Sequence, residues 1–414
     1  MNTISSQNPF FETYSTLHST VPFDKIKTGD YVPAIREGIR RQNAEIEAII
    51  RNPEVPTFAN TVLAYEKSGE MLHRVSTVFG NLLSAETDDD LQELAKEIMP
   101  MMSEHENNIS LNEELFARIK AVYKQQDKET LSPEQHKLLE DIYNGFVRNG
   151  ANLLGEDKEK YRALCKELSL LTLQFSENNL KETNDYKLVI TDKSQLAGLP
   201  ESAVEAAAET AGEKGVEGWV FTLQAPSYGP FLTYADSRDL RRELYMAYNT
   251  KCTHDNASNN LEIVKKLANV RMEIAQLLGY DNFAEYNLQE RMAQNSESVY
   301  KLLDQLLEAY TPTAKQEYAE VQALARQAEG EDFVLMPWDW AYYSHKLKDR
   351  KFNIDDELLR PYFELNNVKQ GVFGLATRLY GITFKKNPDI PVYHKDVDAY
   401  EVFDKDGKFL AVFY

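Results

Sequence analysis

The sequence is poor in cysteine. Only Cys165 and Cys252 occur among its 414 residues, too few for the disulfide framework of a small secreted protein. The first residues form neither a basic segment nor an apolar core, so no signal peptide is predicted. We therefore expect a cytoplasmic protein whose two thiols are buried or idle.

Positive charge and long hydrophobic runs are also scarce. Lys and Arg number 46 against 66 Asp and Glu, which gives a formal net charge of −20. An acidic protein repels phosphate, and this argues against nucleic acid and anionic membranes as partners. No stretch approaches the ~20 consecutive apolar residues of a membrane-spanning helix. The content of hydrophobic residues, 43%, and of charged residues, 27%, is that of an ordinary globular protein.

Most of the sequence has the periodicity of helices. Apolar residues recur every three or four positions, as on one face of an α-helix, in segments 31–51, 132–146, 164–175 and 298–310. Ser132-Pro133 is a helix start, because Ser is a favoured N-cap and Pro fits the first helical position. The acidic residues 88–90 start another helix, where negative charge meets the positive end of the helix dipole.

Strand signals are few. Residues 219–223 and 231–234 flank a turn rich in Pro and Gly, which predicts a small two-stranded excursion from a helical body. Near the end of the sequence, 400–403 and 409–414 flank Asp406-Gly407, a dipeptide typical of hairpin turns.

The sequence thus predicts a mainly α fold, a large helical body with a small β excursion and a C-terminal β-hairpin. No Gly/Ser-rich or Pro-rich linker divides it, which favours one continuous body over independent domains. Three regions can be named: a helical region at 1–150, a helical region with the small inserted sheet at 151–255, and a helical region that leads to the hairpin at 256–414.

The sequence holds no complete motif for a metal or phosphate site. No two of its seven His are four residues apart, so no helix presents a His pair to one metal ion. His105-Glu106 begins like the zinc motif H-E-x-x-H, but Ile109 occupies the position of the second His. We expect a solvated polar helix end there. No catalytic or metal-binding residue is predicted in this chain.

One segment, 337–346, is dense in aromatic residues with polar tips. Asp339, Tyr342 and Tyr343 would share a helix face, and Trp338 and His345 would lie on a neighbouring line. Such side chains suit a wet cleft that binds peptide or sugar. The alternative is an aromatic core in which Asp339 is a buried hydrogen-bond acceptor, and residue chemistry alone favours that alternative. The candidate site residues are Trp338, Asp339, Tyr342, Tyr343 and His345.

Ten stretches spread over essentially the whole chain carry a resemblance to a known family. They are Asn8–Phe10, Pro22–Ile26, Pro56–Thr61, Gly198–Pro200, Asp236–Arg242, Glu290–Ala293, Pro337–Ser344, Leu359–Val368, Leu379–Phe384 and Asp389–His394. In these stretches the chain resembles the thimet oligopeptidase family of zinc metallopeptidases, and in particular its bacterial peptidyl-dipeptidase branch.

The resemblance implies a mostly helical fold whose two halves enclose a deep channel, with this chain forming one wall. It also implies hydrolysis of short peptides, with dipeptides released from the C-terminus in this branch. The five candidate site residues would then lie along the channel. In the family, the two His of H-E-x-x-H and a downstream Glu bind zinc, and the Glu of the motif activates water.

The zinc motif does not occur in this sequence. The resemblance places it after the segment matched by Glu401–Tyr414, so neither the metal ligands nor the catalytic Glu can be assigned here. We therefore expect the chain to be the N-terminal portion of such a peptidase, inactive alone, with short peptides and the missing C-terminal segment as its partners. The alternative function is that of a non-catalytic helical protein that binds peptides or acts as a scaffold.

Overall fold

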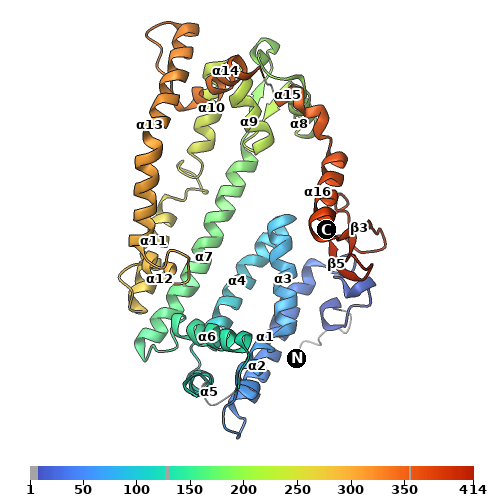
Figure 1. Cartoon of the computed structure of the whole chain (residues 1–414), viewed down its shortest axis with the longest axis vertical. Helices are drawn as coiled ribbons and strands as arrows, with labels where there is room; N and C mark the ends of the chain where they lie inside the picture. The colour runs from blue at the N-terminus through green and yellow to red at the C-terminus, as the bar shows by residue number, and fades with distance from the viewer. Residues whose placement is uncertain (1–7, 126–129, 354–355) are drawn as a thin grey trace. The chain divides into compact units, whose positions relative to one another are not determined.

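The computed structural model of the chain describes residues 8–125, 130–353 and 356–414. In these ranges the protein is mainly helical, with one two-stranded and one three-stranded antiparallel sheet (Figure 1). The predicted fold class is confirmed. Over the same ranges, no helix combines the length and the apolar character that crossing a membrane would require.

The contacts between residues divide the chain into two compact units, and neither unit is one continuous stretch of sequence. Unit 1 comprises Met1–Leu173, Val270–Asp281 and Val368–Tyr414, and unit 2 comprises Gln174–Asn269 and Asn282–Asn367. Three helices begin in one unit and end in the other: α7 (Glu156–Asp185), α11 (Leu261–Leu277) and α16 (Leu365–Tyr380).

The helices of unit 1 are α1 (Tyr31–Ile50), α2 (Leu63–Glu66), α3 (Glu70–Ala85), α4 (Asp89–Ser110), α5 (Glu113–Lys124) and α6 (Pro133–Arg148). The last three of these, α4, α5 and α6, each begin at a side-chain cap. Before α6, the Ser132 hydroxyl accepts a hydrogen bond from the Gln135 amide, and the Gln135 side chain accepts one from the Ser132 amide. Before α4, the Asp88 carboxylate accepts from the Leu91 amide. Both predicted helix starts are therefore confirmed.

Two hydrophobic clusters form the core of the helical part of unit 1. In the first, Ile35 of α1 packs with Val75 of α3 and Ile98 of α4, and all three are almost completely buried. In the second, Leu115 and Ile119 of α5 pack with Leu139 of α6. The apolar stripes that predicted α1 and α6 thus lie on the faces that these two helices bury.

His105 does not lie at a solvated helix end. It is in the body of α4, 4% exposed, and its Nε2 lies 2.7 Å from Oε1 of Gln42. Burial lowers the pKa of His105, because the charged imidazolium is disfavoured away from water. The prediction was wrong because the His side chain turns toward α1, which the local sequence does not reveal.

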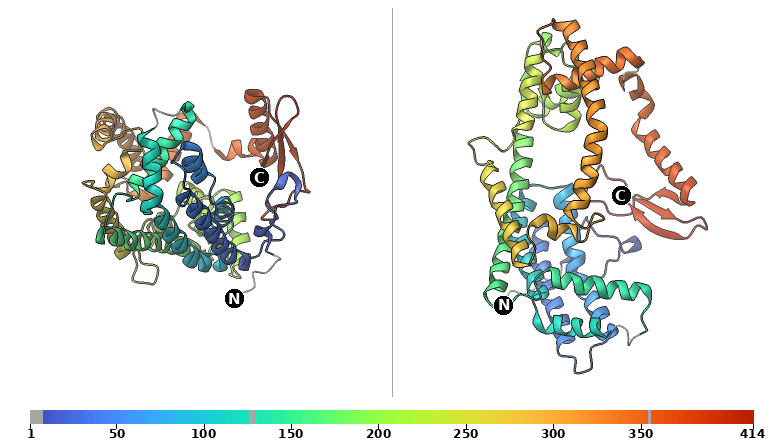
Figure 2. Two further views of the ribbon diagram at one scale, coloured as in Figure 1. Left: turned by 90° about the horizontal axis from the view of Figure 1, so that it is seen from below. Right: turned by 60° about the vertical axis from the view of Figure 1, so that its left-hand side comes forward.

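The C-terminal sheet of unit 1 contains β3 (Thr383–Lys386), β4 (Tyr400–Phe403) and β5 (Phe409–Phe413) in that order, all antiparallel. The predicted hairpin is β4–β5, and Gly407 takes a φ of 78° in its turn. Figure 2 (right) shows the sheet beside α16, where the Phe373 ring stacks on Phe384 with 4.2 Å between ring centroids. The third strand, β3, was not predicted.

The segment before α1 is fixed to this sheet by His18. Its Nε2 lies 2.7 Å from Oε1 of Glu401 on β4, and its ring stacks on Phe409 of β5 with 3.6 Å between centroids. His18 itself takes a φ of 57°, a backbone conformation that is uncommon outside glycine. The hydrogen bonds from His18 and Asn387 lower the pKa of Glu401.

Unit 2 contains the other helices and the small sheet. Its helices are α8 (Glu201–Glu213), α9 (Ala225–Tyr234), α10 (Arg238–Asn249), α12 (Phe283–Leu288), α13 (Ser296–Glu329), α14 (Trp340–Phe352) and α15 (Asp356–Leu359). The sheet pairs β1 (Leu188–Ile190) with β2 (Trp219–Phe221). Residues 231–234, predicted as a strand, lie in α9. Pro226 fits the first turn of that helix because its missing N–H would be unbonded there anyway.

Helix α13 is continuous through Pro312, and its length is visible in Figure 1 (orange). Its C-terminal part is held in unit 2 by Val321 and Ala325, which pack with Leu335, Tyr342 and Tyr343 in one buried cluster. This cluster supports the segment that the sequence singled out.

Candidate functional site

The segment that holds the candidate residues begins as a single turn of 3₁₀ helix, Pro337–Asp339, and continues as α14. Pro337 fits the first position of the turn. The Asp339 carboxylate turns back and accepts a hydrogen bond of 3.0 Å from the amide of Met336. A helix therefore starts here, and its first turn directs Asp339 into the interior of unit 2.

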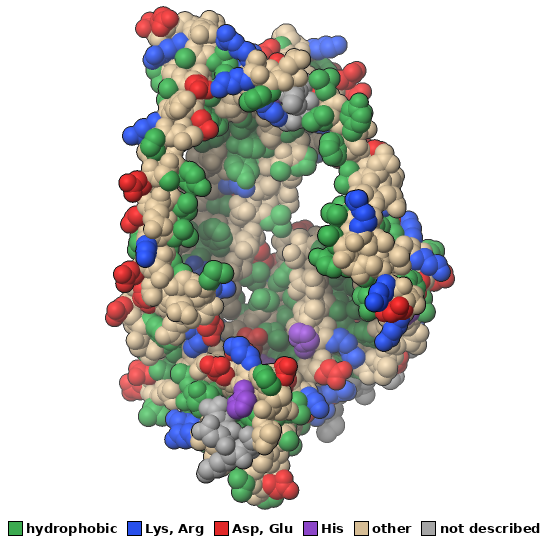
Figure 3. Space-filling view, in the orientation of Figure 1, with side chains coloured by type: hydrophobic (Ala, Val, Ile, Leu, Met, Phe, Trp, Pro, Cys, Tyr) green, Lys and Arg blue, Asp and Glu red, His purple; other side chains and the backbone are tan. Residues whose placement is uncertain are grey.

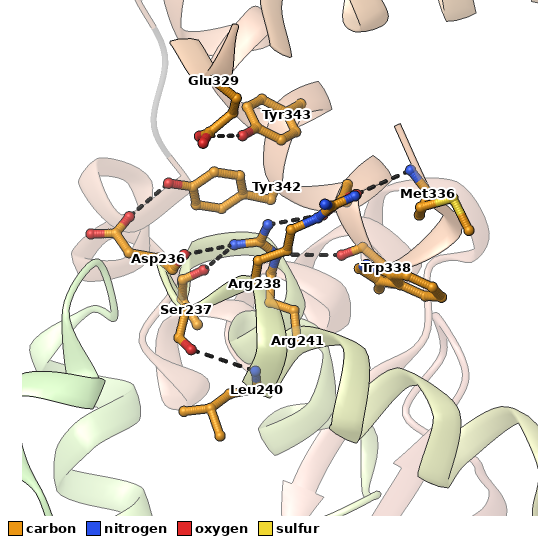
Figure 4. A network of polar contacts seen from close by, with 12 residues as sticks. Asp236, Ser237, Arg238, Leu240, Arg241, Glu329, Met336, Trp338, Tyr342 and Tyr343 are labelled. Carbon is orange, nitrogen blue, oxygen red and sulfur yellow. Dashed lines mark hydrogen bonds and ion pairs between the residues drawn. The ribbon is translucent and has the colours of Figure 1, made fainter. Parts of the chain in front are cut away.

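Asp339 is the acceptor of a buried ionic cluster, and its partners Arg238 and Arg241 are labelled in Figure 4. It is fully buried, and Arg238 donates to both of its oxygens, with Nη2 2.7 Å from Oδ2. Arg241 donates to Oδ1 from Nη2 at 3.0 Å. The guanidinium of Arg241 is itself only 1% exposed, whereas the side chain of Arg238 is 42% exposed. Asp339 therefore pairs with one deeply buried cation and with one that reaches the surface.

Arg241 also joins the turn before α10 to the turn before α14. Its Nη1 donates to the backbone carbonyls of Ala235 and Asp236, at 2.7 and 3.1 Å, and its Nε donates to that of Trp338. Its guanidinium lies over the Tyr342 ring, 4.0 Å from the centroid. Each of these bonds is made by a charged donor, which makes it stronger than a neutral hydrogen bond.

Tyr342 and Tyr343 extend the polar contacts of this cluster in two directions. The Tyr342 hydroxyl donates to Oδ1 of Asp236, and the Tyr343 hydroxyl donates to Oε1 of Glu329, both at 2.7 Å. Burial, followed by the hydrogen bond to a carboxylate, raises the pKa of each phenol well above its usual range. Both phenols are consequently protonated donors at neutral pH.

Trp338 and His345 are half-buried, in contrast to the three residues above. The Trp338 ring has the guanidinium of Arg242 at 5.4 Å and the Tyr245 ring edge-on to it. The His345 ring lies edge-on to Tyr234 with 4.6 Å between centroids. These two aromatic groups keep part of their surface accessible to solvent.

The five candidate residues thus fall into two kinds. Asp339, Tyr342 and Tyr343 are buried and hydrogen-bonded within unit 2, and Asp339 is the buried acceptor that residue chemistry favoured. Trp338 and His345 are partly open. That all five border a peptide channel stays a prediction.

Sequence reasoning did not connect this segment with its partners. Arg238 and Arg241 lie about a hundred positions before Asp339, in a stretch noted only for its resemblance to the family. A signal was present, since Arg residues at i and i+3 on one helix face can both reach a single carboxylate.

Zinc, which the resemblance implies, does not fit the residues that the structure describes. In 8–125, 130–353 and 356–414, no three His, Cys, Asp or Glu side chains are grouped so that they could hold a metal ion. The carboxylate of Asp339 already accepts from two guanidinium groups, so it has no free position for a cation. We derive no catalytic step through zinc from these residues.

Comparisons with known proteins place this geometry in context. Residues 231–414 match Peptidase family M3. Over 414 residues the chain is 39% identical to the dipeptidyl carboxypeptidase of Escherichia coli. This match covers 99% of this chain and 60% of that protein. It is 36% identical to the dipeptidyl carboxypeptidase of Salmonella typhimurium and 32% identical to the oligopeptidase A of Escherichia coli.

These matches cover 99% and 95% of the chain, and 60% and 58% of the two relatives just named. The chain therefore spans about 60% of the length of the curated relatives that it matches. The resemblance to the thimet oligopeptidase family is confirmed by the match of residues 231–414 to Peptidase family M3 and by the similarity of nearly the whole chain to two dipeptidyl carboxypeptidases.

Proposed function

We propose that this chain supplies the peptide-holding, non-catalytic part of a family M3 metallopeptidase that cleaves short peptides and releases dipeptides from their C-terminus. The observation that carries the proposal is a match over 99% of the chain to a dipeptidyl carboxypeptidase, together with the absence of H-E-x-x-H from all 414 residues. The chain alone then has no means of activating water and is inactive.

Within the proposed function, the aromatic segment has two roles. The partly open rings of Trp338 and His345 contact a bound peptide, because amphipathic aromatics bind apolar side chains while their polar edges stay hydrated. Asp339, Tyr342 and Tyr343 are positioning residues that hold the segment rigid through their buried hydrogen bonds. A cytoplasmic location is part of the same proposal.

The test of inactivity is a hydrolysis assay with N-blocked tetrapeptides and added zinc, in which release of the C-terminal dipeptide is followed by chromatography. The dipeptidyl carboxypeptidase of Escherichia coli is the positive control. We expect no product from this chain. If the chain alone hydrolyses the peptides and a chelator abolishes this hydrolysis, the proposal that the chain is inactive is wrong.

To test peptide binding, the same peptides are titrated into the chain while its intrinsic tryptophan fluorescence is recorded. Binding is expected to change the tryptophan signal of the unmodified chain, and the affinity, measured by isothermal titration calorimetry so that no reporter is removed, is expected to fall in Trp338→Leu and His345→Leu. The matched control is His136→Leu, which replaces a His of unit 1. Equal binding by all variants would remove Trp338 and His345 from the proposed site. If the chain binds peptides but shows no peptidase activity with any added C-terminal segment, the alternative of a non-catalytic binding protein is favoured.

A further inference from the structure

The N-terminal part of α13 carries an apolar face that nothing in unit 2 covers. All ten residues from 301 to 310 are exposed. Leu307 is 68% exposed and Tyr310 is 65% exposed. We call this surface the α13 apolar face; it consists of Tyr300, Leu302, Leu303, Leu306, Leu307 and Tyr310. Figure 3 shows hydrophobic side chains gathered along this helix.

The face is one side of an amphipathic helix. At 100° per residue its six members fall in a sector about 160° wide. The opposite sector carries Lys301, Asp304 and Glu308, which suit contact with water. A stripe of this width is typical of a helix that faces a protein core, and it is wider than a coiled-coil seam. The same helix buries Val321 and Ala325 farther along, so its C-terminal part is covered while the face at its N-terminal part is not.

An uncovered face of this size indicates an interaction site. Large contiguous apolar patches are rare on monomeric proteins and mark surfaces that bind another element. A helix without tertiary packing is also only marginally stable in water, because most helical stability in proteins comes from the burial of an amphipathic face.

We propose that the α13 apolar face docks an amphipathic helical segment from the part of the family M3 peptidases that has no counterpart in this chain. The inference rests on the proposed function, and it adds the surface through which the two parts join. The match covers only 60% of the dipeptidyl carboxypeptidase of Escherichia coli, so the relatives carry the additional polypeptide that such a face requires.

Two other occupants fit the face less well. A short substrate peptide would bury its backbone N–H and C=O groups against four leucines that offer no hydrogen bonds, which is costly. A second copy of the chain would bring together two molecules that each carry a net charge of −20, and like charges of that size oppose association. An amphipathic helix makes its own backbone hydrogen bonds and can turn its apolar side toward the α13 apolar face.

The test is a pull-down after co-expression of the full chain with a tagged polypeptide, namely the part of the Escherichia coli dipeptidyl carboxypeptidase outside the match. The variant is Leu303→Gln/Leu307→Gln. Its matched control is Lys301→Gln/Glu308→Gln on the opposite side of the helix. All four side chains are exposed, so the far-UV circular dichroism of both variants should equal that of the unmodified chain.

We expect the tagged polypeptide to retain the unmodified chain and the control, and to retain the leucine variant about tenfold less. Equal retention of all three chains would overturn the proposal, as would no retention of the unmodified chain. Light scattering of the chain alone gives a further check. A dimer that the leucine substitutions convert to a monomer would assign the face to a second copy and overturn the proposal.

The proposed function and the docking surface can fail separately. The retained pair is assayed for zinc-dependent release of dipeptides. Retention that depends on Leu303 and Leu307 without any peptidase activity supports the surface and contradicts the function. Activity that is restored equally in the leucine variant supports the function and contradicts the surface.

Discussion

Replacing Asp339 by Asn tests the buried ionic cluster of unit 2. The substitution keeps the shape of the side chain but removes the charge that faces Arg241, whose guanidinium is 1% exposed. Breaking a buried ion pair on one side costs about 3–5 kcal/mol, because the other charge stays buried without compensation. Arg238→Gln removes a partner whose side chain is 42% exposed, and a pair of this exposure is worth only about 1 kcal/mol or less.

The assay is urea unfolding followed by tryptophan fluorescence. The three Trp of the chain, Trp219, Trp338 and Trp340, all lie in unit 2, so the transition reports the stability of that unit. With a slope of about 2 kcal/mol per M, the midpoint of Asp339→Asn falls by about 2 M, and that of Arg238→Gln by about 0.5 M or less.

A second variant separates the charge from the shape of the site. Adding Arg241→Met to Asp339→Asn removes the stranded cation, so the double variant should be more stable than the sum of the two single effects. A midpoint for Asp339→Asn within about 0.3 M of the unmodified chain would refute the reasoning. So would strict additivity of the two changes.

Two further predictions concern a carboxylate of unit 1 and the glycines of unit 2. The pKa of Glu37 is lowered to about 2, first by the hydrogen bond from Arg40. The ionised carboxylate therefore stabilises unit 1 fully above the ordinary pKa of 4.5, and this contribution is lost as the pH falls toward 2. The loss of stability in Glu37→Gln, measured by circular dichroism in urea, should therefore be larger at pH 6 than at pH 3, and an equal loss at both would contradict it. Gly218 has a φ of 102°, and a Cβ there would lie 2.3 Å from the carbonyl oxygen of Ile190, so Gly218→Ala should lower the fluorescence midpoint. Gly212 lies in α8 with no neighbour within 4 Å, so Gly212→Ala should raise stability by about 0.5–1 kcal/mol. A higher midpoint for Gly218→Ala than for Gly212→Ala would contradict this reasoning.

The helices were largely predictable because their signals are local. The capping box at Ser132 and the N-cap at Asp88 each involve residues three positions apart, and an apolar stripe repeats within a few turns. The same local signals explain the error in 231–234. Apolar and aromatic residues next to Pro and Gly fit a strand and its turn, yet β2 pairs with β1 and leaves that segment to α9.

The sequence predicted which residues make up the candidate segment, but not which distant residues they contact. The density of Trp, Tyr, Asp and His in 337–346 identified the segment. Which of these side chains is buried depends on Arg238 and Arg241, and no periodic pattern connects residues separated by 101 and 98 positions. Ion pairs over such distances in the sequence are set by tertiary packing, which local rules do not encode.

The contact between His18 and Glu401 has a consequence for biosynthesis. The two residues are 383 positions apart, and a ribosome that adds about 5–20 residues per second needs roughly 20–80 s to cover that distance. For this time the His18 ring lacks Phe409 and the Phe23 ring lacks Tyr393 and Tyr414, so both rings stay available to chaperones. A slower ribosome should lengthen this exposure without changing the final structure.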